Sequence, residues 1–82
     1  MYSIIFNNLA EKQLKKLDTD LQRRILEVLD RILIRPHHFV KRLVGSSYFR
    51  LRVGDYRIIL DIQNDKLVVV VIEIGHRKNI YD

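Results

Sequence analysis

Residues 48–58 read YFRLRVGDYRI, in which two alternating segments flank the pair Gly54-Asp55. Such a pair favours the tight turn of a β-hairpin, and alternation of apolar with charged residues is typical of a strand with one buried face. A turn at this pair places Arg52 opposite Arg57, and cross-strand neighbours lie on the same side of a sheet. The stretch therefore predicts a hairpin with one apolar side and one arginine-bearing side.

The two sides of this hairpin have different roles. The apolar side must face the core and collects Phe49, Leu51, Val53, Tyr56, Ile58, Leu60 and Ile62. The other side collects Tyr48, Arg50, Arg52 and Arg57. Opposed like charges destabilise a sheet, whereas guanidinium groups suit paired hydrogen bonds to phosphate. We therefore predict a phosphate-binding surface; a solvated basic face with Asp61 as partial counter-charge is the alternative.

The rest of the chain predicts an α+β fold with the element order β-α-α-β-β-β. The expected elements are a strand at 2–6, helices at 8–17 and 19–34, and strands at 47–53, 56–62 and 66–74. Capping residues begin the helices, and Pro36 ends the second one. We expect an antiparallel sheet with the helical hairpin on one face and the basic side opposite.

A second two-residue turn is expected at Asn64-Asp65. It would bring aliphatic residues to the arginine side, namely Ile59, Val68, Val70 and Ile72. An open face that is part arginine and part aliphatic is unusual for a free monomer. We expect the tail of the chain or a partner protein to cover it, with a dimer interface as the plainer explanation.

Composition restricts the classes of protein that fit. The 82 residues suffice for one domain, residues 1–82, and 48% of them are apolar. The absence of cysteine excludes disulfides and zinc-thiolate sites. No apolar run is long enough for a membrane span and no signal peptide is evident, so we expect a cytoplasmic protein. The net charge of +5 favours a polyanionic partner without choosing between nucleic acid and protein.

The C-terminal segment adds polar groups near the arginines. After Gly75 come His76, Arg77, Lys78 and Tyr81, at the end of the last predicted strand. Such a cluster is typical of a phosphoryl-transfer site. The adjacent His37-His38 point in opposite directions on an extended segment and have no third ligand nearby, so we expect no metal and no other cofactor.

Two segments, RLRVGDYR at 50–57 and GHRKNIY at 75–81, resemble the RelE/ParE toxin superfamily. The chain is most similar to the RelE-type mRNA interferases of archaea and bacteria, and the resemblance covers essentially its whole length. It implies a RelE-like fold and a toxin of a type II toxin–antitoxin system. The implied activity is that of a metal-independent endoribonuclease, which enters the ribosomal A site, cleaves mRNA and inhibits translation.

The resemblance also implies residue roles. Arg57 would hold the scissile phosphate, Arg77 would stabilise the leaving 5′-oxygen, Tyr81 would orient the nucleotide, and Arg50 would lie near the 2′-hydroxyl. Because arginine keeps its proton, His76 is chemically a better general base than Arg50. The expected RNA-binding residues are Arg52, Tyr48, His76, Lys78, Lys41 and Arg42.

The implied partners are a cognate RelB-like antitoxin, the ribosome and mRNA, with no membrane. The toxin and antitoxin would assemble into a heterotetramer. One alternative is a ParE-type toxin that binds DNA gyrase without nuclease chemistry, although that branch more often lacks the combination of Arg57, Arg77 and Tyr81. A catalytically silent RNA- or protein-binding module is the other.

Overall fold

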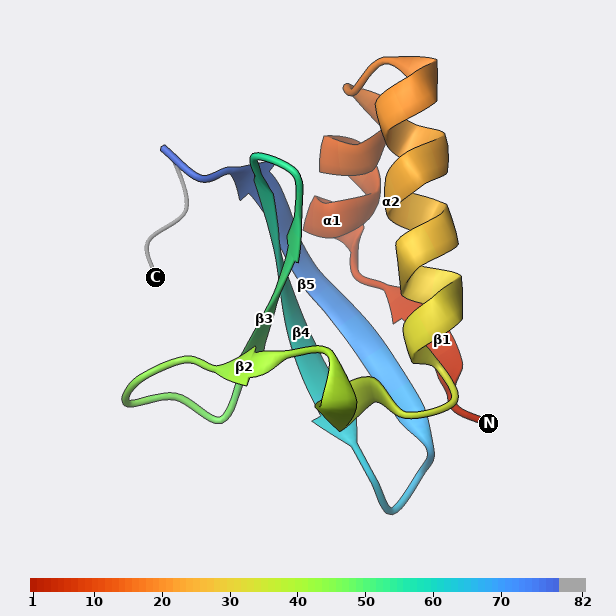
Figure 1. Ribbon diagram of the computed structural model, residues 1–82, viewed down its shortest axis with the longest axis vertical. Coiled ribbons are helices and arrows are strands. Elements are labelled where there is room, and N and C mark those ends of the chain that lie inside the picture. The colour runs from red at the N-terminus through yellow and green to blue at the C-terminus, as the bar shows by residue number, and fades with distance from the viewer. Residues whose placement is uncertain (79–82) are drawn as a thin grey trace.

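The computed structural model describes residues 1–78. It consists of a mixed β-sheet with two helices packed on one of its faces (Figure 1). The strands lie in the order β1-β5-β4-β3-β2, so the first strand pairs with the last. The elements are β1 (Ser3–Phe6), α1 (Asn8–Lys15), α2 (Thr19–Ile32), the 3₁₀ helix η1 (Pro36–His38), β2 (Lys41–Arg42), β3 (Phe49–Val53), β4 (Tyr56–Gln63) and β5 (Val68–His76). The α+β class and the order of the predicted elements are confirmed.

The sheet differs from the prediction at both edges. It is mixed rather than antiparallel, because β1 runs parallel to β5, with Ser3 opposite Val68. The two residues of β2 pair with β3, although no strand was predicted between the helix at 19–34 and the strand at 47–53. Where β1 has ended, the Gln13 side chain of α1 accepts a hydrogen bond from the backbone N–H of Ile74, at 2.7 Å. The Gln13 side chain thus satisfies the N–H of Ile74, which a longer β1 would have paired.

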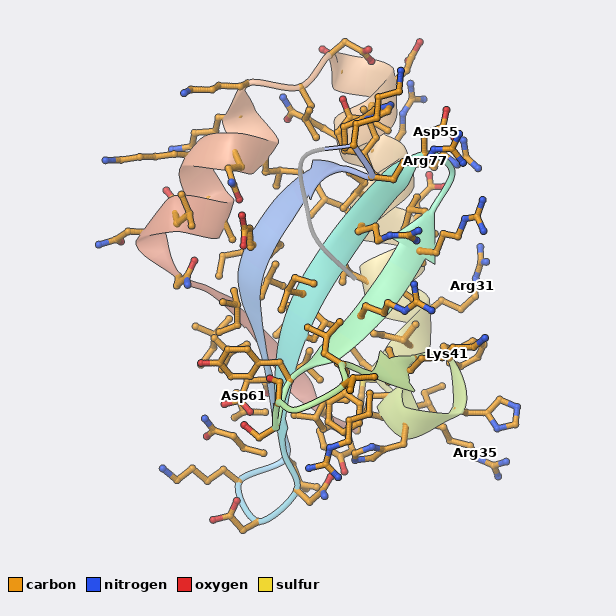
Figure 2. All side chains as sticks on the ribbon, turned by 90° about the vertical axis from the view of Figure 1, so that its left-hand side faces the viewer. Arg31, Arg35, Lys41, Asp55, Asp61 and Arg77 are labelled. Atoms are coloured by element: carbon orange, nitrogen blue, oxygen red, sulfur yellow. The ribbon has the colours of Figure 1, made fainter. Side chains whose placement is uncertain are left out.

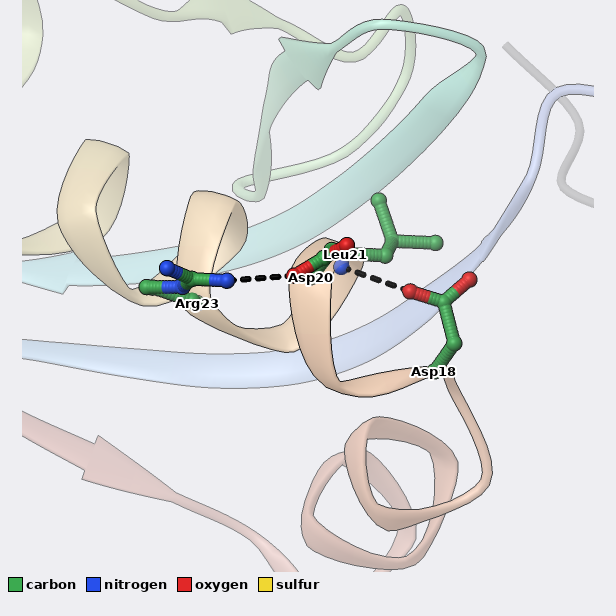
Figure 3. Close-up of polar contacts among 4 residues, drawn as sticks. All are labelled: Asp18, Asp20, Leu21 and Arg23. Atoms are coloured by element: carbon green, nitrogen blue, oxygen red, sulfur yellow. Dashed lines mark hydrogen bonds and ion pairs between the residues drawn. The ribbon is translucent and has the colours of Figure 1, made fainter.

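Capping side chains separate the two helices, as the sequence predicts. The Asn7 carboxamide oxygen accepts a hydrogen bond from the N–H of Ala10, at 2.8 Å. The Asp18 carboxylate accepts one from the N–H of Leu21, at 2.9 Å, and Asp20 forms an ion pair with Arg23 beside it (Figure 3). Each helix ends two residues earlier than expected.

The Asp18 cap provides a test of local stability. Asp18→Ala is expected to lower the free energy of unfolding by about 1 kcal/mol, because the first turn of α2 loses an acceptor for its free N–H groups. Asp20→Ala is the matched control, since its ion pair with Arg23 lies at the surface and contributes little. Urea denaturation followed by circular dichroism measures both; equal losses would contradict the capping role.

The core lies between the helices and the sheet. Fully enclosed side chains come from α1, α2, β4 and β5, and include Ala10, Ile25, Leu29, Ile58, Leu60, Val69 and Val71. Every residue predicted for the apolar side of the central hairpin lies in this cluster or packs against it. Helical spacing and strand alternation therefore bury the same set of residues that the sequence indicated.

The central hairpin has the predicted register. Val53 lies opposite Tyr56 and Arg52 opposite Arg57, with Gly54 in the left-handed region at φ 59°. The turn residue Gly54 supplies this conformation without a steric penalty. The arginines therefore lie on the face that the helices leave uncovered.

The second hairpin differs from its prediction. The turn at Asn64-Asp65 was wrong, because Gln63 pairs with Val68 and a four-residue loop separates them. The Asn64 carboxamide oxygen accepts a hydrogen bond from the Tyr2 hydroxyl, at 2.8 Å, and lies 2.7 Å from Nε2 of His37. Contacts with distant parts of the chain therefore hold this loop.

A β-bulge in β5 changes which residues share a side. Ile59 lies opposite Glu73 while Leu60 lies opposite Val71, so Ile72 is an extra residue. The bulge puts Ile74 into the core and leaves Glu73 on the arginine side, where Ile72 had been expected. Such a bulge reverses the side of the sheet to which each following side chain of the strand points.

Candidate nucleic-acid interface

A pocket of about 350 Å³ opens on the face of the sheet opposite the helices. It is lined by Phe39, Lys41, Arg50, Arg52 and Arg57. Four of these five side chains are cationic, and no carboxylate of residues 1–78 lines the pocket. Its volume suits a small ligand or one unit of a polymer, and its charge favours an anion such as a phosphate group.

The sheet positions the three arginines. Arg50 and Arg57 are half-buried on β3 and β4, whereas Arg52 is exposed and its Nε donates to the Gly54 carbonyl at 3.3 Å. Nε of Arg57 is itself buried. A half-buried guanidinium keeps its charge, since arginine stays protonated in proteins. Arg57 and Arg50 thus offer a fixed positive charge in a partly desolvated site, where it attracts an anion more strongly than it would in water.

Arg77 is held at one end of the same face. Its backbone N–H donates to the Asp55 carbonyl at 2.8 Å, two residues beyond the pairing of Arg57 with Gly75. Arg77 lies in the turn directly after β5, two residues from the Gly75 that pairs with Arg57, so its backbone lies at the end of the face that carries Arg57. Figure 2 looks onto this face and shows Arg77 beside Asp55. Arg77 is exposed and does not line the pocket.

The bulge at Ile72 determines the side on which His76 lies. Without the extra residue, alternation along β5 would put His76 on the side of Arg57. Instead His76 lies opposite Tyr56, and the two rings are in edge-to-face contact with centroids 5.4 Å apart. The structure therefore does not bring the proposed base His76 to the arginines.

The other predicted site residues divide between the two sides of the sheet. Lys41 lies opposite Arg50 and lines the pocket, whereas Arg42 pairs with Phe49 and has its guanidinium 5.6 Å from that ring. Neighbours in a strand point to opposite faces, which separates Lys41 from Arg42. Tyr48 is 38% exposed.

Two of the remaining predicted residues lie in the C-terminal segment. Lys78 is exposed at the end of the described chain, and its backbone N–H donates to Nδ1 of His76 at 3.3 Å. Tyr81 lies outside the described residues.

The sequence did not indicate three residues of this region. Phe39 forms part of the pocket wall although it follows η1 in a connecting segment. Figure 2 shows Arg31 and Arg35 on the flank of the open face, on the same side as Lys41. A cation on a helix end or in a loop carries no periodic signal, so only the folded chain shows that these residues lie together.

Metal-binding groups and membrane-spanning helices were also sought in residues 1–78. This part of the chain contains no group of three or more histidine, aspartate or glutamate side chains placed to hold a metal ion. Within the same residues, no helix is long and apolar enough to cross a membrane.

Residues 4–81 match the sequence model of the family described as "ParE toxin of type II toxin-antitoxin system, parDE". The chain belongs to this toxin family. Like its relatives, this member of the RelE/ParE superfamily has the fold of RelE toxins. Its superposition on one chain of the RelBE2 toxin–antitoxin complex of Mycobacterium tuberculosis covers 93% of this chain and 98% of that chain. The TM-score is 0.83 and the sequence identity is 25%. For the archaeal RelE–RelB complex of Pyrococcus horikoshii the shares are 96% and 98%, with a TM-score of 0.80 and 27% identity.

Curated relatives of this family member carry RelE names. The mRNA interferase toxin RelE of Escherichia coli is 28% identical over 80 residues, which are 94% of this chain and 84% of that protein. Toxin RelE3 of Methanocaldococcus jannaschii is 39% identical over 44 residues, which are 52% of this chain and 48% of that protein. The match with the second relative therefore spans about half of its length.

Proposed function

We propose that this chain is the toxin of a type II toxin–antitoxin pair and cleaves mRNA in the A site of the ribosome. The observation that carries the proposal is the pocket in which Arg50, Arg52 and Arg57 meet Lys41, on the side of the sheet that also holds Arg77. The name of its Escherichia coli relative, an mRNA interferase, supports the same activity. The site of action would be the cytoplasm, where ribosomes translate.

The proposed reaction is attack of a ribose 2′-oxygen on the adjacent phosphorus. The bond between the 2′-oxygen and phosphorus forms and the bond from phosphorus to the 5′-oxygen breaks, which leaves a 2′,3′-cyclic phosphate and a free 5′-hydroxyl. Negative charge grows on the phosphoryl oxygens and on the leaving oxygen. Arg57 would stabilise the first and Arg77 the second, because fixed cations stabilise charge that develops in the transition state.

Proton transfer would depend on groups other than these arginines. Arginine cannot accept a proton near neutral pH, and His76 is packed against Tyr56 on the opposite side of the sheet. We propose that the 2′-proton passes to the ribosome or to solvent, that the leaving 5′-oxygen takes up a proton from the same source, and that Arg50 and Lys41 hold the strand in line for attack. The mechanism uses no metal ion. Tyr81 would orient the attacked nucleotide.

The test is to add the purified chain to ribosomes that carry a defined message in a known frame. Primer extension is expected to reveal new 5′ ends at the A-site codon, and the same message without ribosomes is expected to remain nearly intact. We expect ribosome dependence because the described residues that line the pocket are four cations and a phenylalanine, which supply charge and orientation. Intact messages on the ribosome would contradict the proposal, and equally fast cleavage of free RNA would contradict the dependence.

A second candidate is a ParE-type toxin that acts on DNA gyrase. The family description that matches residues 4–81 favours it. A gyrase supercoiling assay separates the two, since the nuclease candidate predicts no inhibition of supercoiling and the gyrase candidate predicts no cut message.

We also propose a cognate RelB-like antitoxin as the protein partner. The structural relatives from Mycobacterium tuberculosis and Pyrococcus horikoshii are toxin–antitoxin complexes. Acidic side chains of the antitoxin would neutralise the arginine face and so prevent RNA from binding. Light scattering of the purified complex would test the expected heterotetramer. Equal growth inhibition with and without the co-expressed antitoxin would contradict the pairing.

A further inference from the structure

Phe39 differs from the other phenylalanines of the chain in its surroundings. Phe6 and Phe49 are half-buried and pack against the core, whereas Phe39 is 47% exposed and lies outside the core cluster. Its ring forms one wall of the pocket, and the other lining residues in the described part of the chain are cationic. Large aromatic side chains are usually withdrawn from water, so an exposed ring beside four cations marks a surface for a ligand that has both a flat apolar part and negative charge.

The chain on either side of Phe39 is anchored. Pro36 is fully buried, and the Phe39 N–H donates to the Pro36 carbonyl at 3.2 Å. Directly after Pro36, Nε2 of His37 lies 2.7 Å from the Asn64 carboxamide oxygen. The His37 ring also makes an edge-to-face contact with the Phe49 ring, with centroids 5.2 Å apart. Val40 then packs against the core. The backbone that carries the exposed ring is therefore fixed before any ligand binds, which lowers the entropic cost of binding.

Neighbouring rings and charges restrict how a ligand can approach. The His38 ring meets the Phe39 ring edge to face, with centroids 5.3 Å apart and planes at 76°. The cations lie on the β2, β3 and β4 side, from Lys41 to Arg57. A nucleic-acid strand combines the two features required, because each phosphate lies next to a base with an apolar face.

We propose that Phe39 stacks against a base of single-stranded RNA whose adjacent phosphate lies among Arg50, Arg57 and Lys41. This inference rests on the proposed function in that it adds a base-binding residue to the same pocket. Stacking tolerates any base, since every base has a π-face. Phe39 is thus a positioning residue: it fixes the strand against the arginines and takes no part in proton transfer.

The experiment compares two fluorescent RNA strands of about eight nucleotides, a length within the range that small nucleic-acid-binding domains cover. One carries bases and the other is an abasic strand with the same ribose-phosphate backbone. Fluorescence anisotropy at low salt measures the binding of each strand to the full chain. Phe39→Ala is expected to weaken binding of the base-bearing strand about 5- to 100-fold and to leave binding of the abasic strand unchanged.

Three further variants separate stacking from structure. Phe39→Trp is expected to keep the wild-type affinity, whereas Phe39→Leu should behave like Phe39→Ala because it keeps the apolar bulk and loses the aromatic face. Leu26→Ala removes a side chain of similar exposure (43%) from α2 on the other side of the sheet and should change neither affinity. Equal loss for both strands in Phe39→Ala, full affinity in Phe39→Leu, or equal binding of the two strands by the wild-type chain would overturn the proposal.

Message cleavage on ribosomes, measured in parallel, keeps this inference distinct from the proposed function. A wild-type chain that binds bases through Phe39 but cuts no message would refute the nuclease and leave the stacking role standing. A chain that cuts messages while Phe39→Ala binds both strands as the wild type does would refute the stacking role alone.

Discussion

Arg57→Ala is expected to slow cleavage of a ribosome-bound message by about 10²- to 10³-fold, the loss that follows removal of one donor to a developing oxyanion. Arg57 lies on β4, where its backbone pairs with Arg52 of β3 on one side and with Gly75 of β5 on the other. The residue is half-buried. Alanine leaves the scissile phosphate without that charge and without a two-pronged donor. Single-turnover cleavage, followed by primer extension, measures the rate.

Two further substitutions serve as comparisons for the cleavage rate of Arg57→Ala. Arg57→Lys keeps the charge but loses the planar fork, so an intermediate rate is expected. Arg23→Ala removes an arginine from the outer surface of α2, where it pairs with Asp20, and should cut at the wild-type rate. Circular dichroism would show that Arg57→Ala remains folded. A folded Arg57→Ala chain that cuts as fast as wild type would refute the role assigned to this residue.

Leu60→Ala is expected to lower the free energy of unfolding by about 2–5 kcal/mol, the range found when a buried leucine is truncated. Leu60 is fully buried on β4, opposite Val71 at the bulge. For 82 residues the total stability is roughly 4–12 kcal/mol, so this single change removes a large part of it. Urea denaturation provides the measurement.

The control for the core substitution lies on α1. Leu9→Ala truncates the same side-chain type at a position that is 50% exposed, so it leaves little cavity and should cost much less stability. Similar unfolding midpoints for the two variants would mean that the enclosed cluster around Leu60 does not determine the stability of the sheet.

Much of the fold follows from short stretches of the chain. Asn7 and Asp18 cap the helices at the predicted places, because a capping side chain acts within three residues of itself. The parallel pairing of β1 with β5 has no such local signal. It brings Ser3 next to Val68, and an edge strand of four residues reveals nothing about a partner that lies more than sixty positions away.

The sequence by itself determined the turn at Gly54-Asp55, the register that opposes Arg52 to Arg57, and the side on which those arginines lie. These depend on a two-residue turn and strict alternation, which neighbouring residues set among themselves. Only the tertiary structure decided the bulge at Ile72, which places His76 opposite Tyr56 and away from the arginines, and the position of Phe39 on the wall of the pocket. The physical reason is that core packing and contacts between distant segments select these features, by burying Ile74 while leaving Glu73 outside the core.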